Sequence, residues 1–161
     1  MTLQQRKTAE ENNHLIGIRD SYYSLATIQQ YRGEYSGAIK NYREYIKYSK
    51  DNNLNSNFTD TYSNICECLR KTQNYKETLN EVKEAWSECQ SDYDRFDIKL
   101  QECYALFMLG RYDDFLKEYN CLKEHKAYDR DLHGSVKEAV ETFKKMLDGK
   151  DQEVMETIKR F

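Results

Sequence analysis

The chain has 161 residues, a formal net charge of −3, 39% hydrophobic and 33% charged residues, and a mean hydropathy of −1.00. This length suits one domain, and no apolar run approaches the roughly 20 residues that span a bilayer. The acidic balance, without a local cluster of Lys and Arg, argues against nucleic acid as the main partner, because phosphate binding needs a basic face.

Residues that form turns are scarce. Proline is absent and glycine occurs six times, which favours an all-α fold with short connections over a sheet with many turns. Tyrosine is unusually frequent, with 14 residues. We expect most of these tyrosines to lie between helices, with the ring buried and the hydroxyl at the edge.

The chain opens with a polar lead at residues 1–14, which we expect to fray or to add a solvent-facing turn of helix. It lacks the apolar core of a secretory signal, so a cytoplasmic protein is expected. Apolar residues at helical spacing then predict helices over about 15–31 and 36–50. Only Arg32-Gly33-Glu34 separates them, and helices so closely connected lie back to back.

The same arrangement returns twice after an Asn-rich run at 50–57, which is expected to be a loop with N-cap candidates. Alignment on the first residue after each turn places Tyr35, Tyr75 and Tyr112 in register, spaced by 40 and 37 residues. Self-similarity at such a period is typical of a solenoid, in which each helix pair stacks on the next.

The repeats divide the single domain. We expect repeat units at 15–53, 58–91 and 94–125 and a pair of capping helices at 131–161. The capping pair carries apolar stripes with polar outer faces, as suits an end that faces water.

The residues that recur in these units resemble the tetratricopeptide repeat, in which aromatic, Leu and small residues of a first helix meet Ala and aromatic residues of a second. The spacing is longer than the family's usual period of about 34 residues. The resemblance implies a right-handed α-solenoid of three repeats, with Tyr22, Leu25, Ala38 and Tyr42 as residues of its core. The matching residues are Tyr22, Leu25, Ala26, Gly33, Tyr35, Ala38, Tyr42 and Tyr45 in the first unit, Tyr62, Ile65, Cys66, Leu69, Tyr75, Leu79 and Ala85 in the second, and Cys103, Leu106, Gly110, Tyr112, Leu116 and Tyr119 in the third.

The resemblance also implies a concave groove, lined by the first helix of each unit, that binds a peptide or protein segment. Amides and hydroxyls on one wall would bond to the backbone of an extended peptide, while aromatic residues on the other would accept its side chains. We expect Leu100, Phe107 and Met108 either to join this groove or to pack against the capping helices. The residues expected to bind the partner are Tyr23, Thr27, Gln30, Tyr31, Asn64, Glu67, Arg70, Lys71, Gln101 and Tyr104.

Three acidic residues, Asp20, Asp60 and Asp97, recur at one aligned position near the expected start of each first helix. One interpretation is that they complement the helix dipole. The other is that they form an acidic edge of the groove, which would select a basic peptide.

The sequence offers no pattern that indicates catalysis, a metal site or a cofactor. The five cysteines lack the spacing of a zinc site, and Cys66 and Cys103 fall at small-residue positions, where we expect buried, reduced thiols. The three histidines have no nearby Cys or carboxylate in a catalytic spacing, and no glycine-rich phosphate loop occurs. We therefore expect a protein that is not an enzyme.

These observations favour a protein-interaction adaptor, and two alternatives remain. The first is a regulator that responds to a signalling peptide, similar to bacterial peptide receptors. The second is a structural subunit, or a homo-oligomer, that docks through Val154, Ile158 and Phe161 of its C-terminal helix.

Overall fold

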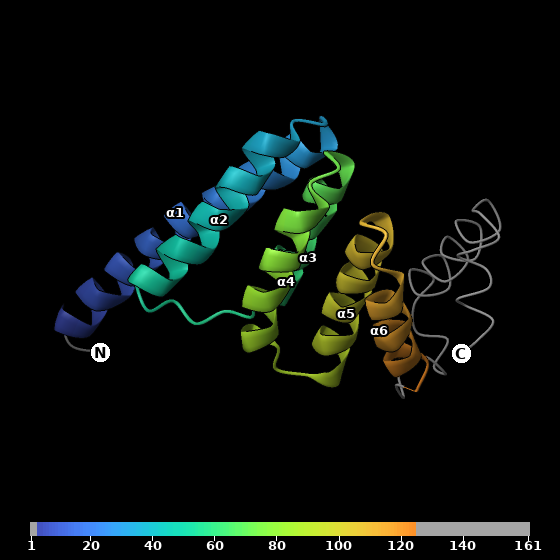
Figure 1. Cartoon of the computed structure of the whole chain (residues 1–161). Helices are drawn as coiled ribbons and strands as arrows, with labels where there is room; N and C mark the ends of the chain where they lie inside the picture. Colours follow the sequence, from blue (N-terminus) through green and yellow to red (C-terminus); the bar gives the residue numbers. More distant parts are fainter. Residues whose placement is uncertain (1–2, 125–161) are drawn as a thin grey trace.

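The computed structural model describes residues 3–124, in which six helices follow one another and no strand occurs (Figure 1). Each helix packs against the next in the chain, and α3 also packs against α5. The predicted all-α class is confirmed, whereas the capping pair predicted at 131–161 lies outside the described residues. The helices are α1 (Leu3–Tyr31), α2 (Tyr35–Asp51), α3 (Thr59–Lys71), α4 (Tyr75–Glu88), α5 (Asp92–Met108) and α6 (Tyr112–Glu124).

The first helix is longer than the sequence pattern indicated. It begins at Leu3 rather than near residue 15, so most of the polar lead is helical. This lead is rich in Gln, Lys, Arg and Glu and contains neither Gly nor Pro, so its backbone favours helix although it has no apolar stripe. In Figure 1 the N-terminal part of α1 extends beyond the end of α2.

The turns within the three helix pairs share one backbone conformation. Gly33, Gln73 and Gly110 occupy aligned positions and have φ angles of 76°, 60° and 72°, in the left-handed region. The next residue then donates its N–H to a carbonyl in the last turn of the first helix, a closure typical of helix C-termini. These bonds are Glu34 to Gln29 (2.9 Å), Asn74 to Leu69 (2.8 Å) and Arg111 to Leu106 (3.0 Å).

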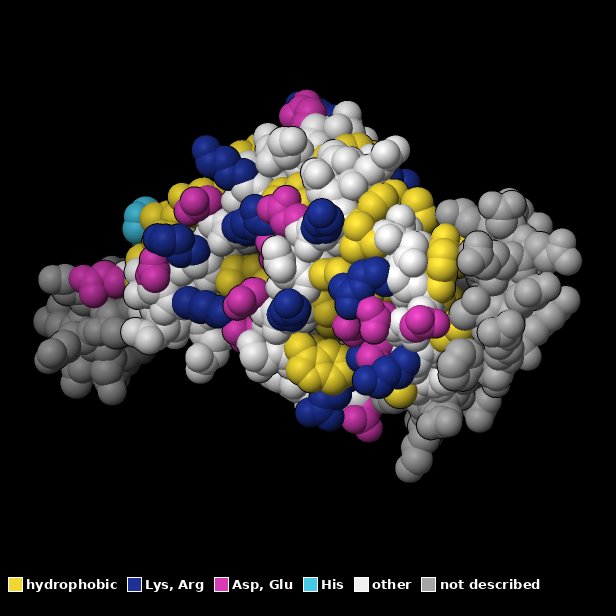
Figure 2. Space-filling model, viewed as in Figure 1, with side chains coloured by type: hydrophobic (Ala, Val, Ile, Leu, Met, Phe, Trp, Pro, Cys, Tyr) yellow, Lys and Arg dark blue, Asp and Glu magenta, His cyan; other side chains and the backbone are white. Residues whose placement is uncertain are grey.

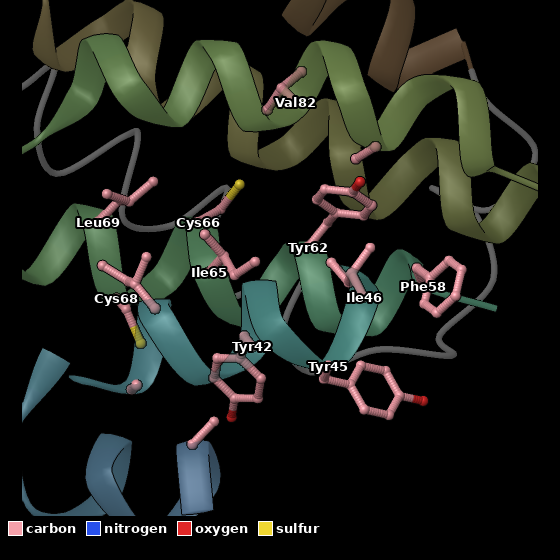
Figure 3. Packing of buried hydrophobic residues seen from close by; sticks show 14 of the residues in the cluster. Tyr42, Tyr45, Ile46, Phe58, Tyr62, Ile65, Cys66, Cys68, Leu69 and Val82 are labelled. Carbon is pink, nitrogen blue, oxygen red and sulfur yellow. The ribbon is translucent and has the colours of Figure 1, made fainter. Parts of the chain in front are cut away.

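The core consists of two clusters. The larger joins α1 to α4 and includes Tyr42, Ile65, Leu69 and Val82 (Figure 3). The smaller joins α5 and α6 around Phe96, Phe107, Phe115 and Leu106. In each pair, the first and the second helix thus contribute side chains to the same apolar cluster.

Small residues sit at the closest point of each helix pair. Ala26, Cys66 and Cys103 are aligned, and all three have no exposed surface. The prediction that Cys66 and Cys103 are buried thiols in place of a smaller residue is therefore confirmed, and both are free of disulfides. Burial raises the pKa of both thiols and raises that of Cys68 to about 11, so all three stay protonated at neutral pH.

One predicted core residue is not in the core. Ala38 and Tyr42 are buried as expected and Tyr22 is partly buried, but the Leu25 side chain remains 46% exposed. Its aligned counterpart Ile65 is fully buried. The repeat pattern predicted Leu25 as a contact residue, but no described helix precedes α1 to cover it.

Ion pairs connect the second helices of the first two pairs. Arg43 bonds to Glu77 (2.8 Å) and to Glu81, and Lys50 bonds to Glu88 at 2.6 Å. Figure 2 shows Lys and Arg interspersed with Asp and Glu over the visible face of the described residues. Such exposed pairs contribute little to stability individually, so the apolar clusters hold the helix pairs together.

Substituting two glycines with alanine should change stability in opposite directions. Gly33→Ala places a side chain at φ 76° and should lower the free energy of unfolding by about 1 kcal/mol. Gly17→Ala lies inside α1, where a Cβ meets no atom within 4 Å, and should raise it by about 0.5–1 kcal/mol. Urea titrations followed by circular dichroism measure both values, and a loss of stability in both variants would contradict the assignment of α1 as one continuous helix.

Candidate functional site

A groove of about 550 Å³ lies where α1, α2 and α3 meet. It contains seven of the residues predicted to bind a partner, so the structure brings these seven together in one place. The lining residues are Tyr23, Thr27, Gln30, Tyr31, Tyr35, Tyr42, Asn64, Glu67 and Lys71.

A chain of hydrogen bonds crosses the groove from α2 through α1 to α3. The Tyr42 hydroxyl donates to Gln30 Oε1 at 2.7 Å, and Gln30 Nε2 donates to Glu67 Oε2 at 3.0 Å. The Tyr42 hydroxyl also lies 3.3 Å from Thr27 Oγ1. Because each group has a defined donor or acceptor role, the Gln30 amide is held in one orientation.

A second bridge joins the same helices near Tyr23. Asn64 Nδ2 donates to the Tyr23 hydroxyl at 3.3 Å, and the Tyr23 ring packs edge-on against the rings of Tyr42 (5.4 Å between centroids) and Tyr45 (5.3 Å). Burial raises the pKa of Tyr23 and of Tyr42, so both phenols remain neutral donors. The floor of the groove is therefore rich in hydrogen-bonding groups that already have partners, and the Glu67 carboxylate is its acidic member.

The rim of the groove differs from its floor. Tyr31 is 88% exposed and Lys71 is also exposed, whereas Glu67 is partly buried beside Gln30. An aromatic ring and an ammonium group are thus free to contact a bound molecule, while the polar floor stays fixed.

The remaining predicted binding residues lie outside this groove, between α3 and α5. The Arg70 guanidinium lies 4.4 Å from the centre of the Tyr104 ring, a distance at which cation–π attraction is effective. Arg70 Nε and Gln101 Oε1 are buried without a hydrogen-bond partner among the described residues. One is a donor and the other an acceptor, and leaving such groups unpaired costs folding free energy.

Two residues that were expected either in the groove or against the capping helices do not line the groove, and the capping helices lie outside the described residues. Leu100 and Phe107 are buried in the smaller core cluster. The Phe107 ring packs edge-on against Tyr112 (5.5 Å between centroids) and Phe115 (5.2 Å), both on α6. Met108 is partly buried against the same cluster. The pairing of α5 with α6 therefore takes up these side chains.

The aligned acids do not share one role. Only Asp60 lies in the first turn of its helix, because Asp20 is inside the long α1, where it pairs with Arg19 at 2.8 Å. Asp97 lies beyond the first turn of α5, and Ser63 donates to its carboxylate. The helix-dipole interpretation is thus wrong for Asp20 and Asp97. Burial, together with the charge of Asp60, raises the pKa of Asp97 despite the Ser63 bond.

Asp94, which was not among the predicted residues, completes a capping box at the start of α5. The Asp94 N–H donates to Ser91 Oγ at 3.1 Å, and the Ser91 N–H donates to Asp94 Oδ2 at 3.0 Å. The spacing Ser-x-x-Asp is close to the Ser-x-x-Glu signature of this motif and could have revealed it. Burial alone would raise the pKa of Asp94, but bonds from Gln90, Ser91 and Asn57 lower it.

Neither a comparison with models of known protein families nor a search of curated proteins finds a match to this chain. In the described part of the chain, no three His, Cys, Asp or Glu residues gather where a metal ion could be held. No helix within residues 3–124 is both long and apolar enough to cross a membrane. The function must therefore be argued from the geometry of the groove.

Two substitutions of Asp by Asn should have opposite effects at neutral pH. Asp94→Asn weakens the charge-assisted cap and should lower the free energy of unfolding by about 1 kcal/mol. Asp97→Asn removes a charge that burial disfavours and should raise it by about 1 kcal/mol or less.

The pH dependence separates the two acids. Asp94 has a lowered pKa in the folded state, so its contribution is present above the unfolded pKa of about 3.9 and is lost as pH falls through the folded pKa. Asp97 has a raised pKa, so its penalty develops as pH rises above about 3.9. Urea titrations between pH 3 and 7 test both signs, and equal effects of the two substitutions would contradict these roles.

Proposed function

We propose that the chain is a protein-interaction module that binds an extended peptide segment in the groove between α1 and α3. In this proposal the helix pairs form a right-handed solenoid of three tetratricopeptide-like repeats. One observation carries it: residues from helices far apart in the sequence line a single groove whose volume lies within the range of about 300–1,000 Å³ typical of ligand sites.

The fixed floor of the groove supports binding without much loss of entropy. Tyr42, Gln30 and Glu67 are already joined by hydrogen bonds, and Asn64 is joined to Tyr23. Ordering a side chain at an interface costs about 0.5–1.5 kcal/mol. Because these side chains are ordered before a ligand arrives, that cost is largely absent.

The chemistry of the lining suits a peptide backbone. Asn64 and Gln30 carry amides, and Thr27 and Tyr23 carry hydroxyls, so alternating N–H and C=O groups of an extended chain find both acceptors and donors. The exposed ring of Tyr31 offers a surface for an apolar side chain of the ligand. Glu67 and Lys71 have opposite charges and give the groove no strong net preference for charge.

In this proposal the bound peptide continues from the groove onto the face between α3 and α5. A peptide that leaves the groove across α3 would next meet Arg70 and then Gln101, each of which holds one unpaired buried group. If these side chains turn toward the peptide, a carbonyl accepts from Arg70 and an N–H donates to Gln101. The bonds gained would offset the cost of leaving these groups unpaired.

Asparagine-to-alanine substitutions test the groove. Peptides of 12 residues, selected from a random library on the full chain, should lose about tenfold or more in affinity with Asn64→Ala, because a buried hydrogen bond and the Tyr23 bridge are removed. Asn80→Ala changes the same residue type at an exposed position of α4 and should have no effect. Isothermal titration calorimetry measures both.

The proposal fails if the selected peptides bind both variants as tightly as the original chain. It also fails if Asn80→Ala weakens binding as much as Asn64→Ala, because the loss would then not be specific to the groove.

A second candidate, a regulator that responds to its peptide ligand, is favoured by the way the first helices are joined. Backbone contact links α3 to α5, whereas no comparable contact links α1 to α3 within residues 3–124. Side-chain bridges such as Gln30–Glu67 connect α1 to α3 instead. A ligand in the groove could therefore draw the first helix pair toward the second without breaking packed backbone.

Small-angle X-ray scattering distinguishes the two candidates. A regulator should show a smaller radius of gyration when the selected peptide is added to saturation. Gln30→Ala removes the bridge to Glu67, so this variant should show a larger decrease in radius of gyration. A rigid adaptor should give the same scattering curve with and without peptide. Asn80→Ala again serves as the control.

A further inference from the structure

An apolar ridge runs along the last turns of α1. Leu25 and Ile28 are 46% and 47% exposed, and Tyr31 continues the ridge at the next position on this side of the helix. Leu25 and Ile28 lie outside the groove, so the proposed peptide does not cover them. Large apolar side chains that adjoin one another on a surface are typical of interaction sites.

The other first helices show what this position normally does. In the alignment on Tyr35, Tyr75 and Tyr112, Ile28 corresponds to Cys68 of α3 and to Ala105 of α5. Both counterparts are 0% exposed, as is Ile65, the counterpart of Leu25 in α3. The Ile28 position is therefore buried in both other first helices and the Leu25 position is buried in α3, whereas α5 has the partly exposed Glu102 there.

The helix next to Cys68 of α3 is α2, the second helix of the preceding pair. Figure 3 shows Cys68 pointing from α3 toward α2. The Cys68 thiol is also near enough to Tyr42 of α2 to contribute to the raised pKa of that phenol. In the same way α5 packs against α4, the second helix of the pair before it. Within the described residues α1 has no such preceding helix.

We propose that Leu25 and Ile28 dock an amphipathic helix of a partner protein, packed on α1 as α2 packs on α3. The chemistry of the partner follows from α2, an amphipathic helix whose buried residues are Ala38, Ile39, Tyr42, Tyr45, Ile46 and Ser49. The partner helix thus presents an apolar face of small and bulky side chains. Docking on this face is separate from peptide binding in the groove.

The surroundings of the ridge make this docking apolar rather than ionic. Between α2 and α4, Arg43 pairs with Glu77 and Glu81, but the corresponding positions next to α1 are Gly37 and Asn41. Neither can pair with a cation, and Asn41 already donates to Gln29 at 2.7 Å. Association should therefore change little with salt, in contrast to contacts held by ion pairs.

The test uses the full chain and a synthetic helix with the sequence of residues 34–52. A lactam between Lys47 and Asp51, which form an exposed i,i+4 pair in the chain, keeps the peptide helical without touching its apolar face. Fluorescence anisotropy of the labelled peptide should show saturable binding. The dissociation constant should change less than about twofold between 50 and 500 mM NaCl.

Variants locate the contact. Leu25→Asp combined with Ile28→Asp should weaken binding about tenfold or more, because two apolar contacts are replaced by charges. The Leu25→Ser, Ile28→Ser pair introduces no charge and should weaken binding in the same direction. Trp86→Asp places the same charge at another half-exposed apolar residue and should leave binding unchanged, as should Asn64→Ala in the groove. Circular dichroism confirms that each variant is folded.

Several outcomes would overturn the proposal. These are absence of saturable binding up to about 1 mM peptide, equal binding by the Leu25/Ile28 variants, or loss of binding with Asn64→Ala or Trp86→Asp. Sedimentation equilibrium of the chain alone gives a further such outcome. If the chain self-associates through Leu25 and Ile28 and this excludes the peptide, the ridge on α1 binds a second copy of the chain instead. If the groove selects no peptide but the synthetic helix still binds to Leu25 and Ile28, only the function proposed above is contradicted.

Discussion

The close approach of paired helices depends on one small side chain in each first helix. Ala26, Cys66 and Cys103 occupy aligned positions with no exposed surface, so nothing larger fits without moving the second helix. A small side chain here allows the helices of a pair to pack closely, and the Tyr42 side chain of α2 reaches Gln30 and Thr27 of α1.

Tyr42 shows how the core and the groove share residues. Its ring belongs to the larger apolar cluster, while its hydroxyl reaches Gln30 and Thr27 on the groove floor. A phenylalanine would fill the same space but leave the Gln30 oxygen without its donor. The apolar core and the groove are thus coupled through one side chain, because tyrosine is apolar along its body and polar at its tip.

Helical periodicity predicted the helices well, because residues such as Tyr42, Ile65 and Leu69 mark buried stripes directly. It also brought Gln30, Asn64 and Glu67 to one site, since the repeat alignment assigns each residue to a face of its helix. The start of α1 was not predictable from apolar spacing, because residues 3–14 form helix although their sequence carries no apolar stripe. The exposure of Leu25 was not predicted because burial depends on which neighbour is present, and a single repeat does not encode its neighbour.

The burial of Cys66, Cys68 and Cys103 also determines how these three thiols can be oxidised. Thiolate is the species that oxidants attack, and in the folded chain these sulfurs are both protonated and shielded. Oxidation at these positions must therefore pass through molecules that have opened. An oxidised sulfur is larger and more polar than the site accepts, so a thiol oxidised in an opened molecule hinders the site from closing again. In an oxidising environment, the frequency of local unfolding, together with the oxidant, would therefore set how fast these three thiols are lost.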